Sequence, residues 1–175
     1  AQAAAAGLAG RLRLAFVSSI AYGPLPRWLR AFRAACPQVT VQLREATLDV
    51  QLQAFAAGEI DAGFVLHAPG AAPPGFEALR VLREPLVLAL PEGHALAGKR
   101  SLSIAAAAHE PLVIFPRHIA PSLFDAIVGH YRAIGATPHI VQEAIQMQTL
   151  VNLVSAGMGV AWVPASLMQL QRPGV

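Results

Sequence analysis

The sequence predicts an α/β protein with two lobes built on parallel strands. Apolar residues make up 55% of its 175 residues and charged residues only 13%, which supports a sizeable core and argues against disorder. Strand-like and helix-like patterns alternate along the chain, and this alternation favours parallel sheets with right-handed crossovers. Residues 146–165 form the clearest single unit, which consists of a helix, a glycine turn, a buried strand and a proline.

The first half of the chain is expected to form a β-α-β-α-β lobe. Residues 11–17 alternate and then become apolar, as in a strand, and a loop is expected over 18–23. Pro24 suits a helix start, where its missing N–H costs little, and Gly58 stops the second helix. Asp61 is expected to shape the entrance of the third strand. The predicted elements are a strand at 11–17, a helix at 24–35, a strand at 39–43, a helix at 48–57 and a strand at 60–66.

The second half repeats this alternation. Its last helix has an apolar stripe at Leu150, Leu153 and Val154, and Gly157 stands where a left-handed residue ends a helix. Pro164 then ends the final strand. The expected strands are 79–82, 85–91, 112–115, 139–142 and 160–163. The expected helices are a short one after 102, one at 121–134 and the helix that carries the apolar stripe.

Several classes of function find no support in the sequence. The net charge is +3, but the basic residues are scattered, so nucleic-acid binding is not expected of this segment. One cysteine cannot form an internal disulfide, and no apolar run approaches the length of a membrane span. No metal-ligand spacing, nucleophile elbow or phosphate-binding glycine loop is present, so we expect no metal, no cofactor and no enzyme.

The candidate ligand-binding residues follow strands, because α/β sheets bind ligands beyond the carboxyl ends of their strands. The N-terminus of a helix there attracts a carboxylate. Ser18 and Ser19 equally suit caps of their own helix. Arg117 could pair with an anion but is more commonly an exposed loop residue, and Met147 is more commonly a core residue than a ligand contact. The full candidate set is Ser18, Ser19, Thr47, Leu48, Phe115, Pro116, Arg117 and Met147.

The order and spacing of these pieces resemble the regulatory domain of LysR-type bacterial transcriptional regulators. Each piece is mostly apolar packing and weak by itself, but together they cover nearly the whole chain. The matching pieces are Leu12–Ser19, Leu25–Leu29 with Phe32 and Pro37, Leu52–Phe64, Leu86–Leu96, Leu112–Pro116 and Leu150–Ala165.

The resemblance implies a fold like that of type 2 periplasmic binding proteins, with two Rossmann-like lobes and an effector cleft between them. It places lobe I at residues 11–84, with its C-terminal return missing, and lobe II at 85–175. Residues 1–10 would be the end of a linker helix. The candidate residues named above would line the cleft. The effector would be a small organic acid, with an aromatic acid suggested by the Phe-Pro loop at Phe115.

The resemblance also implies partners. The protein would be cytoplasmic and would form a homodimer or tetramer, with the helix from Pro24 against the partner's 122–134 helix. Contacts are expected from Trp28, Phe32, Phe124 and Tyr131, although these rings also suit each lobe's own core. DNA would be bound only through an N-terminal domain absent from this chain. The alternatives are a solute-binding protein of a transporter and, less supported, an enzyme on the same fold.

Overall fold

The computed structural model describes residues 9–99 and 101–175, and the expected linker helix lies mostly outside this part of the chain. The chain divides into two compact units, unit 1 up to Leu66 and unit 2 from His67. This division falls earlier than the boundary expected at residue 84. Segment 67–84, which separates the two boundaries, has no helix or strand.

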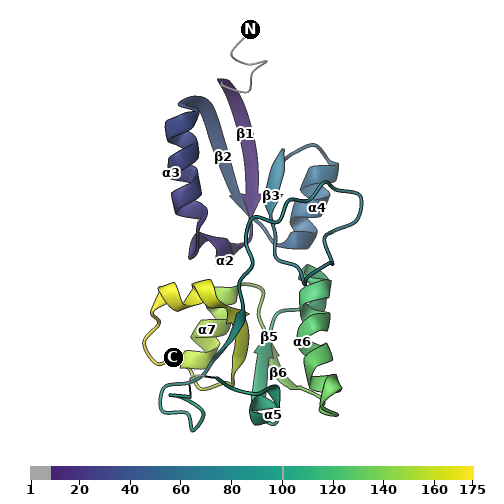
Figure 1. The fold of residues 1–175 in the computed structure, drawn as a ribbon, viewed down its shortest axis with the longest axis vertical. Coiled ribbons are helices and arrows are strands. Elements are labelled where there is room, and N and C mark those ends of the chain that lie inside the picture. Colours follow the sequence, from purple (N-terminus) through teal and green to yellow (C-terminus); the bar gives the residue numbers. More distant parts are fainter. Residues whose placement is uncertain (1–8, 100) are drawn as a thin grey trace. The chain divides into compact units, whose positions relative to one another are not determined.

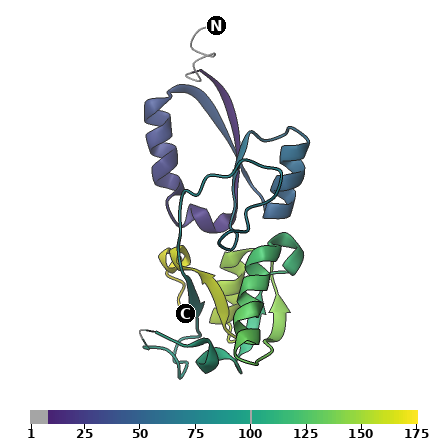
Figure 2. The same ribbon diagram turned by 45° about the vertical axis from the view of Figure 1, so that its right-hand side comes forward.

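Unit 1 is a three-stranded parallel sheet with the order β2-β1-β3, as the β-α-β-α-β pattern predicts. The connection from β1 to β2 runs to one side of the central strand, and the connection from β2 to β3 runs back past it to the other side. Because both crossovers are right-handed, their helices lie on opposite faces of the sheet. Figures 1 and 2 show α3 and α4 on opposite sides of the sheet. The elements of unit 1 are β1 (Ala9–Phe16), α2 (Ser18–Ala21), α3 (Leu25–Ala35), β2 (Gln38–Glu45), α4 (Leu48–Ala56) and β3 (Ala62–Phe64).

Unit 2 contains one parallel pair, β5 with β6, and one antiparallel pair, β4 with β7. Val160 joins the two pairs, because its N–H donates to Pro111 O at 2.8 Å and its carbonyl accepts from Val113 N at 2.8 Å. A Cβ at Gly159 would collide with the Pro111 carbonyl, so this close approach requires glycine. The elements are β4 (Leu86–Ala89), α5 (Ile104–Ala107), β5 (Pro111–Ile114), η1 (Arg117–Ile119), α6 (Pro121–Ala133), β6 (His139–Glu143), α7 (Met147–Ser155), β7 (Ala161–Pro164) and η2 (Ala165–Leu170).

The predicted helix, glycine and strand unit is confirmed. Leu150 and Val154 are fully buried on one face of α7, Gly157 has a φ of +75°, and β7 ends at Pro164. The apolar period of α7 therefore marks the side that faces the core of unit 2.

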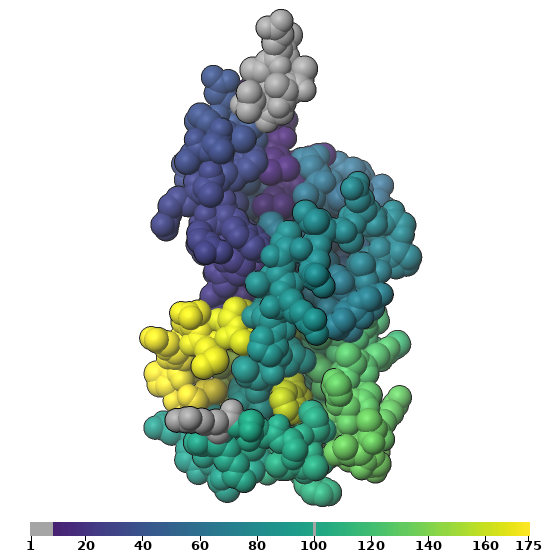
Figure 3. Space-filling model, viewed as in Figure 1, coloured from purple at the N-terminus to yellow at the C-terminus, as the bar shows by residue number. Residues whose placement is uncertain are grey.

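Two predicted elements are wrong. Residues 79–82 form no strand, and Leu79 is 86% exposed, because none of the described strands pairs with this segment. In the space-filling view segment 67–84 lies at the surface (Figure 3). Residues 18–21 form a short helix rather than a loop, since Val17 is extended and serves as its N-cap.

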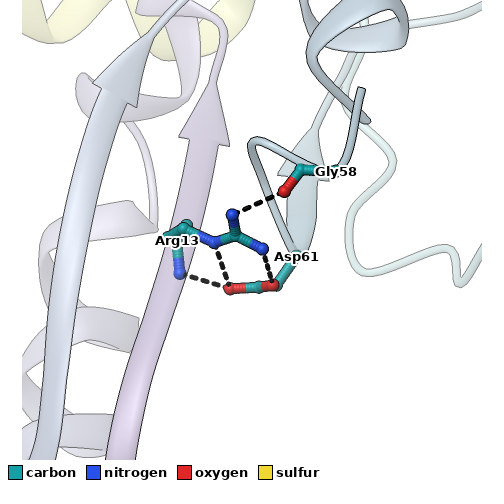
Figure 4. Close-up of polar contacts among 3 residues, drawn as sticks. All are labelled: Arg13, Gly58 and Asp61. Atoms are coloured by element: carbon teal, nitrogen blue, oxygen red, sulfur yellow. Dashed lines mark hydrogen bonds and ion pairs between the residues drawn. The ribbon is translucent and has the colours of Figure 1, made fainter. Parts of the chain in front are cut away.

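A bidentate ion pair ties the entrance of β3 to β1. Arg13 Nη2 and Nε lie 2.6 and 3.2 Å from the Asp61 carboxylate, Arg13 N donates to Asp61 at 2.8 Å, and Nη1 donates to Gly58 O (Figure 4). These bonds from the Arg13 side chain, and then from its backbone N–H, lower the pKa of Asp61 to about 2. This geometry agrees with the expectation that Asp61 shapes the strand entrance.

Candidate functional site

The carboxyl ends of the three strands of unit 1 collect four of the expected site residues. Val17 N donates to Phe64 O at 3.1 Å, and Ala46 N donates to Phe16 O at 3.0 Å. These bonds fix the segments that directly follow β1, β2 and β3. The residues brought to this edge are Ser18, Ser19, Thr47 and Leu48.

The two serines at this edge are buried, with exposures of 6% for Ser18 and 1% for Ser19. They lie inside α2 rather than before it, and its N-cap is Val17. The alternative that the serines cap their own helix therefore does not describe this geometry.

Thr47 is the N-cap of α4, with the extended backbone that this position requires. Its hydroxyl donates to the Asp49 carboxylate at 2.5 Å, and Gln51 N makes the first helical bond to Thr47 O. Asp49 stands in the first turn of α4, where a carboxylate is stabilised by the free amides and the helix dipole. The first turn of α4 therefore carries an acid of its own chain.

Unit 2 gathers a second set of expected residues at the carboxyl ends of β5 and β6. Because these strands are parallel, the segments after them emerge at the same edge, and Ala144 N donates to Ile114 O at 3.0 Å there. Phe115 and Pro116 follow β5, while Gln146 and Met147 begin α7 after β6.

The start of α7 differs from that of α4. Both helices have an extended N-cap residue without a side-chain cap hydrogen bond among the described residues, but the first turn of α7 holds no acid. Met147 is 9% exposed. The first amides of a helix lack partners inside it, so the positive end of α7 is not neutralised by its own first turn.

Phe115 and Arg117 are placed differently from what the sequence suggests. Phe115 is 1% exposed, and its ring packs edge-on against Phe124 with the ring centroids 6.2 Å apart. Arg117 Nε and Nη2 each donate to the Asp125 carboxylate at 2.7 Å. These bonds lower the pKa of Asp125 below its usual value and neutralise the charge expected to meet an anion.

The aromatic side chains expected at a dimer interface largely pack inside their own units. Trp28 lies 5.4 Å from Phe64 between ring centroids. Tyr131 is fully buried, and its hydroxyl accepts a 2.9 Å bond from Trp162 Nε1. Burial raises the pKa of Tyr131, the Trp162 bond acting in the opposite direction. Tyr131 offers no surface to a partner, so its assignment to the interface is corrected: it belongs to the core of unit 2.

Sequence reasoning missed Gln51, which is 3% exposed and lies behind the edge of unit 1. Its Nε2 donates to Ala46 O at 2.8 Å and to Phe64 O at 3.1 Å. A signal was present in its spacing, because Gln51 stands three residues from both Leu48 and Ala54, on the buried face of α4.

A shallow groove of about 500 Å³ lies elsewhere on unit 1. The groove runs along α3 and the turn into β2. It therefore lies at the amino end of β2, whereas the candidate site residues of unit 1 lie at the carboxyl ends of the strands. Its lining residues are Pro26, Leu29, Arg30, Arg33, Ala34, Cys36, Pro37 and Val39.

Within residues 9–99 and 101–175, no group of three or more histidine, cysteine or carboxylate side chains is arranged to hold a metal ion. Likewise, none of the helices in these ranges is long and apolar enough to cross a bilayer.

Residues 5–175 match the family described as the LysR substrate binding domain. Similar proteins include the HTH-type transcriptional regulator IlvR of Caulobacter vibrioides, 47% identical over 97% of this chain and 57% of its own length. AlsR of Bacillus subtilis is 36% identical over 97% of this chain and 56% of its own length. The chain thus spans a little over half the length of these curated relatives.

Solved structures agree. The LysR family regulator CbnR has a TM-score of 0.77 and 30% identity, covering 99% of this chain and 59% of its own. The BenM effector binding domain with its effector benzoate has a TM-score of 0.79 and 26% identity, covering 94% and 74%. These relatives are transcriptional regulators, which disfavours the transporter alternative. The matching family, the similar regulators and the shared fold agree. This chain therefore belongs to the LysR family, as an effector-binding domain with the type 2 periplasmic-binding-protein-like fold.

Proposed function

We propose that this chain senses a small organic acid and that the N-terminus of α7 supplies the main attraction for the carboxylate. The observation that carries this proposal is the contrast between the two helix starts: α4 has Asp49 in its first turn, whereas α7 has no acid there. A carboxylate is stabilised at such a helix end by free amides and the dipole.

The other candidate residues have supporting roles in this proposal. Ser18, Ser19, Thr47 and Leu48 stand at the strand ends of unit 1, and we assign them to the edge that this unit turns to the effector. Met147 offers apolar contact at the start of α7 in unit 2. Phe115 and Pro116 shape the edge of unit 2 from behind, because Phe115 is buried. Arg117 contributes only if an anion displaces Asp125 from its bidentate pair.

An aromatic acid is the first class to test. One solved neighbour is a BenM effector binding domain with its effector benzoate, and the fold here is similar to it. An aromatic ring bound at the start of α7 would meet Met147, the apolar residue that begins this helix. Aliphatic acids of similar size form the comparison group.

The regulatory consequence is also a proposal. The relatives are HTH-type regulators nearly twice as long as this chain. We infer that effector binding shifts a conformational equilibrium and so changes how a linked DNA-binding domain outside this chain sits on DNA. The protein would work in the cytoplasm as a homodimer or tetramer, without catalytic activity. Trp28, Phe32 and Phe124 remain the proposed interface contacts.

Calorimetric titration of the chain with benzoate and with aromatic and aliphatic acids tests the proposal, with benzamide as the neutral control. Benzoate or another acid should bind, and its neutral amide should bind much more weakly. Thr149→Asp, which adds an acid to the first turn of α7, should weaken binding about three- to tenfold, whereas Thr149→Asn should not. Absence of both heat and a thermal shift with every acid would overturn the proposal.

A further inference from the structure

A buried amide joins the strand ends that form the edge of unit 1. The side-chain Nε2 of Gln51 donates to Ala46 O, which follows β2, and to Phe64 O, the last residue of β3. Phe64 O also accepts from Val17 N, which follows β1, and Ala46 N donates to Phe16 O. One side chain therefore takes part in a set of bonds that links all three strand ends of the sheet.

The surroundings of Gln51 hold the amide in one orientation. The residue is 3% exposed, and a Cβ on Gly63 would overlap Gln51 Oε1, so the absence of a side chain at Gly63 makes the space for this amide. Both acceptors of Nε2 are carbonyl oxygens, which fixes which end of the amide is the NH₂ group.

Filling the core of unit 1 does not by itself require a glutamine at this position. Gln51 Oε1 is buried and has no hydrogen-bond partner among the described residues. The amide therefore acts through its NH₂ group, which satisfies the carbonyl groups of Ala46 and Phe64 and ties together the chain after β2 and the end of β3.

We propose that Gln51 is a positioning residue that sets the spacing between the segments after β1, β2 and β3, and thereby the geometry of Ser18 and Thr47 toward the effector. The proposal rests on the proposed function, because it assigns Gln51 to the effector-binding edge of unit 1. Gln51 does not itself touch the effector. It acts through the backbone carbonyls of Ala46 and Phe64.

A measurement on the unaltered chain tests the bonds directly. Gln51 and Gln53 lie on the same helix, but Gln53 is exposed. In NMR hydrogen exchange, the side-chain NH₂ protons of Gln51 should exchange at least about tenfold more slowly than those of Gln53. Equal exchange rates for the two side chains would overturn the proposal.

A variant tests the positioning role. Gln51→Met keeps the length of the side chain and removes both donors, and Gln53→Met is the matched control. In Gln51→Met, exchange of the Val17 and Ala46 backbone amides should accelerate about tenfold relative to the Asp61 amide, which bonds to Arg13 O in the same sheet. If all three amides accelerate together, Gln51 is merely structural and the proposal is wrong.

These readouts need no ligand, so they separate this proposal from the proposed function. Protected Gln51 protons with no binding of any acid would leave Gln51 as an organiser of the strand ends but refute effector sensing. If benzoate or another acid binds but the Gln51 side-chain protons exchange freely, effector sensing is supported and the role proposed for Gln51 is refuted. Where an acid does bind, Gln51→Met should weaken it and Gln53→Met should leave it unchanged.

Discussion

Unit 1 and unit 2 share an alternation of parallel strands and helices, but their interiors differ in kind. Among the described residues, the bulkiest fully buried side chains lie in unit 2, including Leu112, Leu150 and Tyr131, while Ser19 is the one from unit 1. The interior of unit 1 instead holds a buried amide, Gln51, that links its strand ends, and a partly exposed ion pair joins Arg13 to Asp61 nearby. Apolar packing is non-directional, whereas hydrogen bonds fix atoms in place, so unit 1 should be the more sensitive to single polar changes.

The largest expected effect comes from the apolar core of unit 2. Leu150→Ala should lower the free energy of unfolding by about 2–5 kcal/mol, because Leu150 is fully buried and its loss leaves a cavity. Urea denaturation measures this. Met168→Ala, at a residue 68% exposed, is the control and should change stability by less than about 0.5 kcal/mol. A comparable loss in both variants would contradict the assignment of the core.

The next effect probes the polar interior of unit 1. Gly63→Ala should cost about 1–3 kcal/mol of unfolding free energy, because the new methyl group would displace Gln51 Oε1 and break bonds that hold the amide. Gly129→Ala, in α6, meets no atom within 4 Å and should stabilise by about 0.5–1 kcal/mol.

A double-mutant cycle sharpens this test. In a Gln51→Ala background the cost of Gly63→Ala should largely disappear, since the overlapping atom is gone. An unchanged cost in that background would show that the clash involves something other than Gln51.

The two helix starts should respond oppositely to charge. Adding an acid by Thr149→Asp should stabilise α7 by about 0.3–1 kcal/mol, whereas removing one by Asp49→Asn should destabilise α4 by a similar amount. Thermal unfolding at low and high salt measures both changes, and salt should diminish each of them. Stabilisation by Asp49→Asn would contradict the comparison of these helix ends.

The smallest effect is the acid response of the two bidentate ion pairs. The pKa of Asp61 is lowered from 3.8 to about 2, so its contribution to stability is present above pH 3.8 and is lost as the pH falls toward 2. The stability difference between the unaltered chain and Asp61→Asn should therefore shrink over that range.

Asp125 provides the comparison in unit 2. Its pKa is also lowered, by the bonds from Arg117, but the two side chains are 61% and 52% exposed against 38% for both partners in unit 1. Solvent weakens exposed pairs, so Asp125→Asn should show a smaller dependence on pH than Asp61→Asn. A larger dependence for Asp125→Asn would reverse this ranking of the pairs.

Much of the fold could be predicted from the sequence because it depends on local periodicity. The stripe at Leu150 and Val154, the turn at Gly157 and the stop at Pro164 each reflect a property of one residue type in one conformation. The prediction failed for 79–82, where an apolar pattern has no partner strand among the described residues. A strand forms only where another strand is available to pair with it, and the residues of the segment itself do not show whether such a partner exists.

The candidate site divides in the same way. The places of Ser18, Thr47, Phe115 and Met147 could be predicted, because each residue lies in a segment that follows a strand. Parallel strands place their carboxyl ends at one edge of a sheet, so such segments meet there. Position could not reveal that Asp125 neutralises Arg117, since the partner is set by how α6 packs. Burial likewise reversed the expectation for Tyr131.

The sequence by itself determined which segments are helices and strands in most of the chain, that the strands of unit 1 run parallel, and which residues stand at their ends. Only the tertiary structure decided that Gln51 links three strand ends, that Asp125 pairs with Arg117 and that Tyr131 lies in the core of unit 2. The reason is physical: periodicity and turn chemistry act between neighbours along the chain, whereas hydrogen-bond partners and charge neutralisation depend on distances in space.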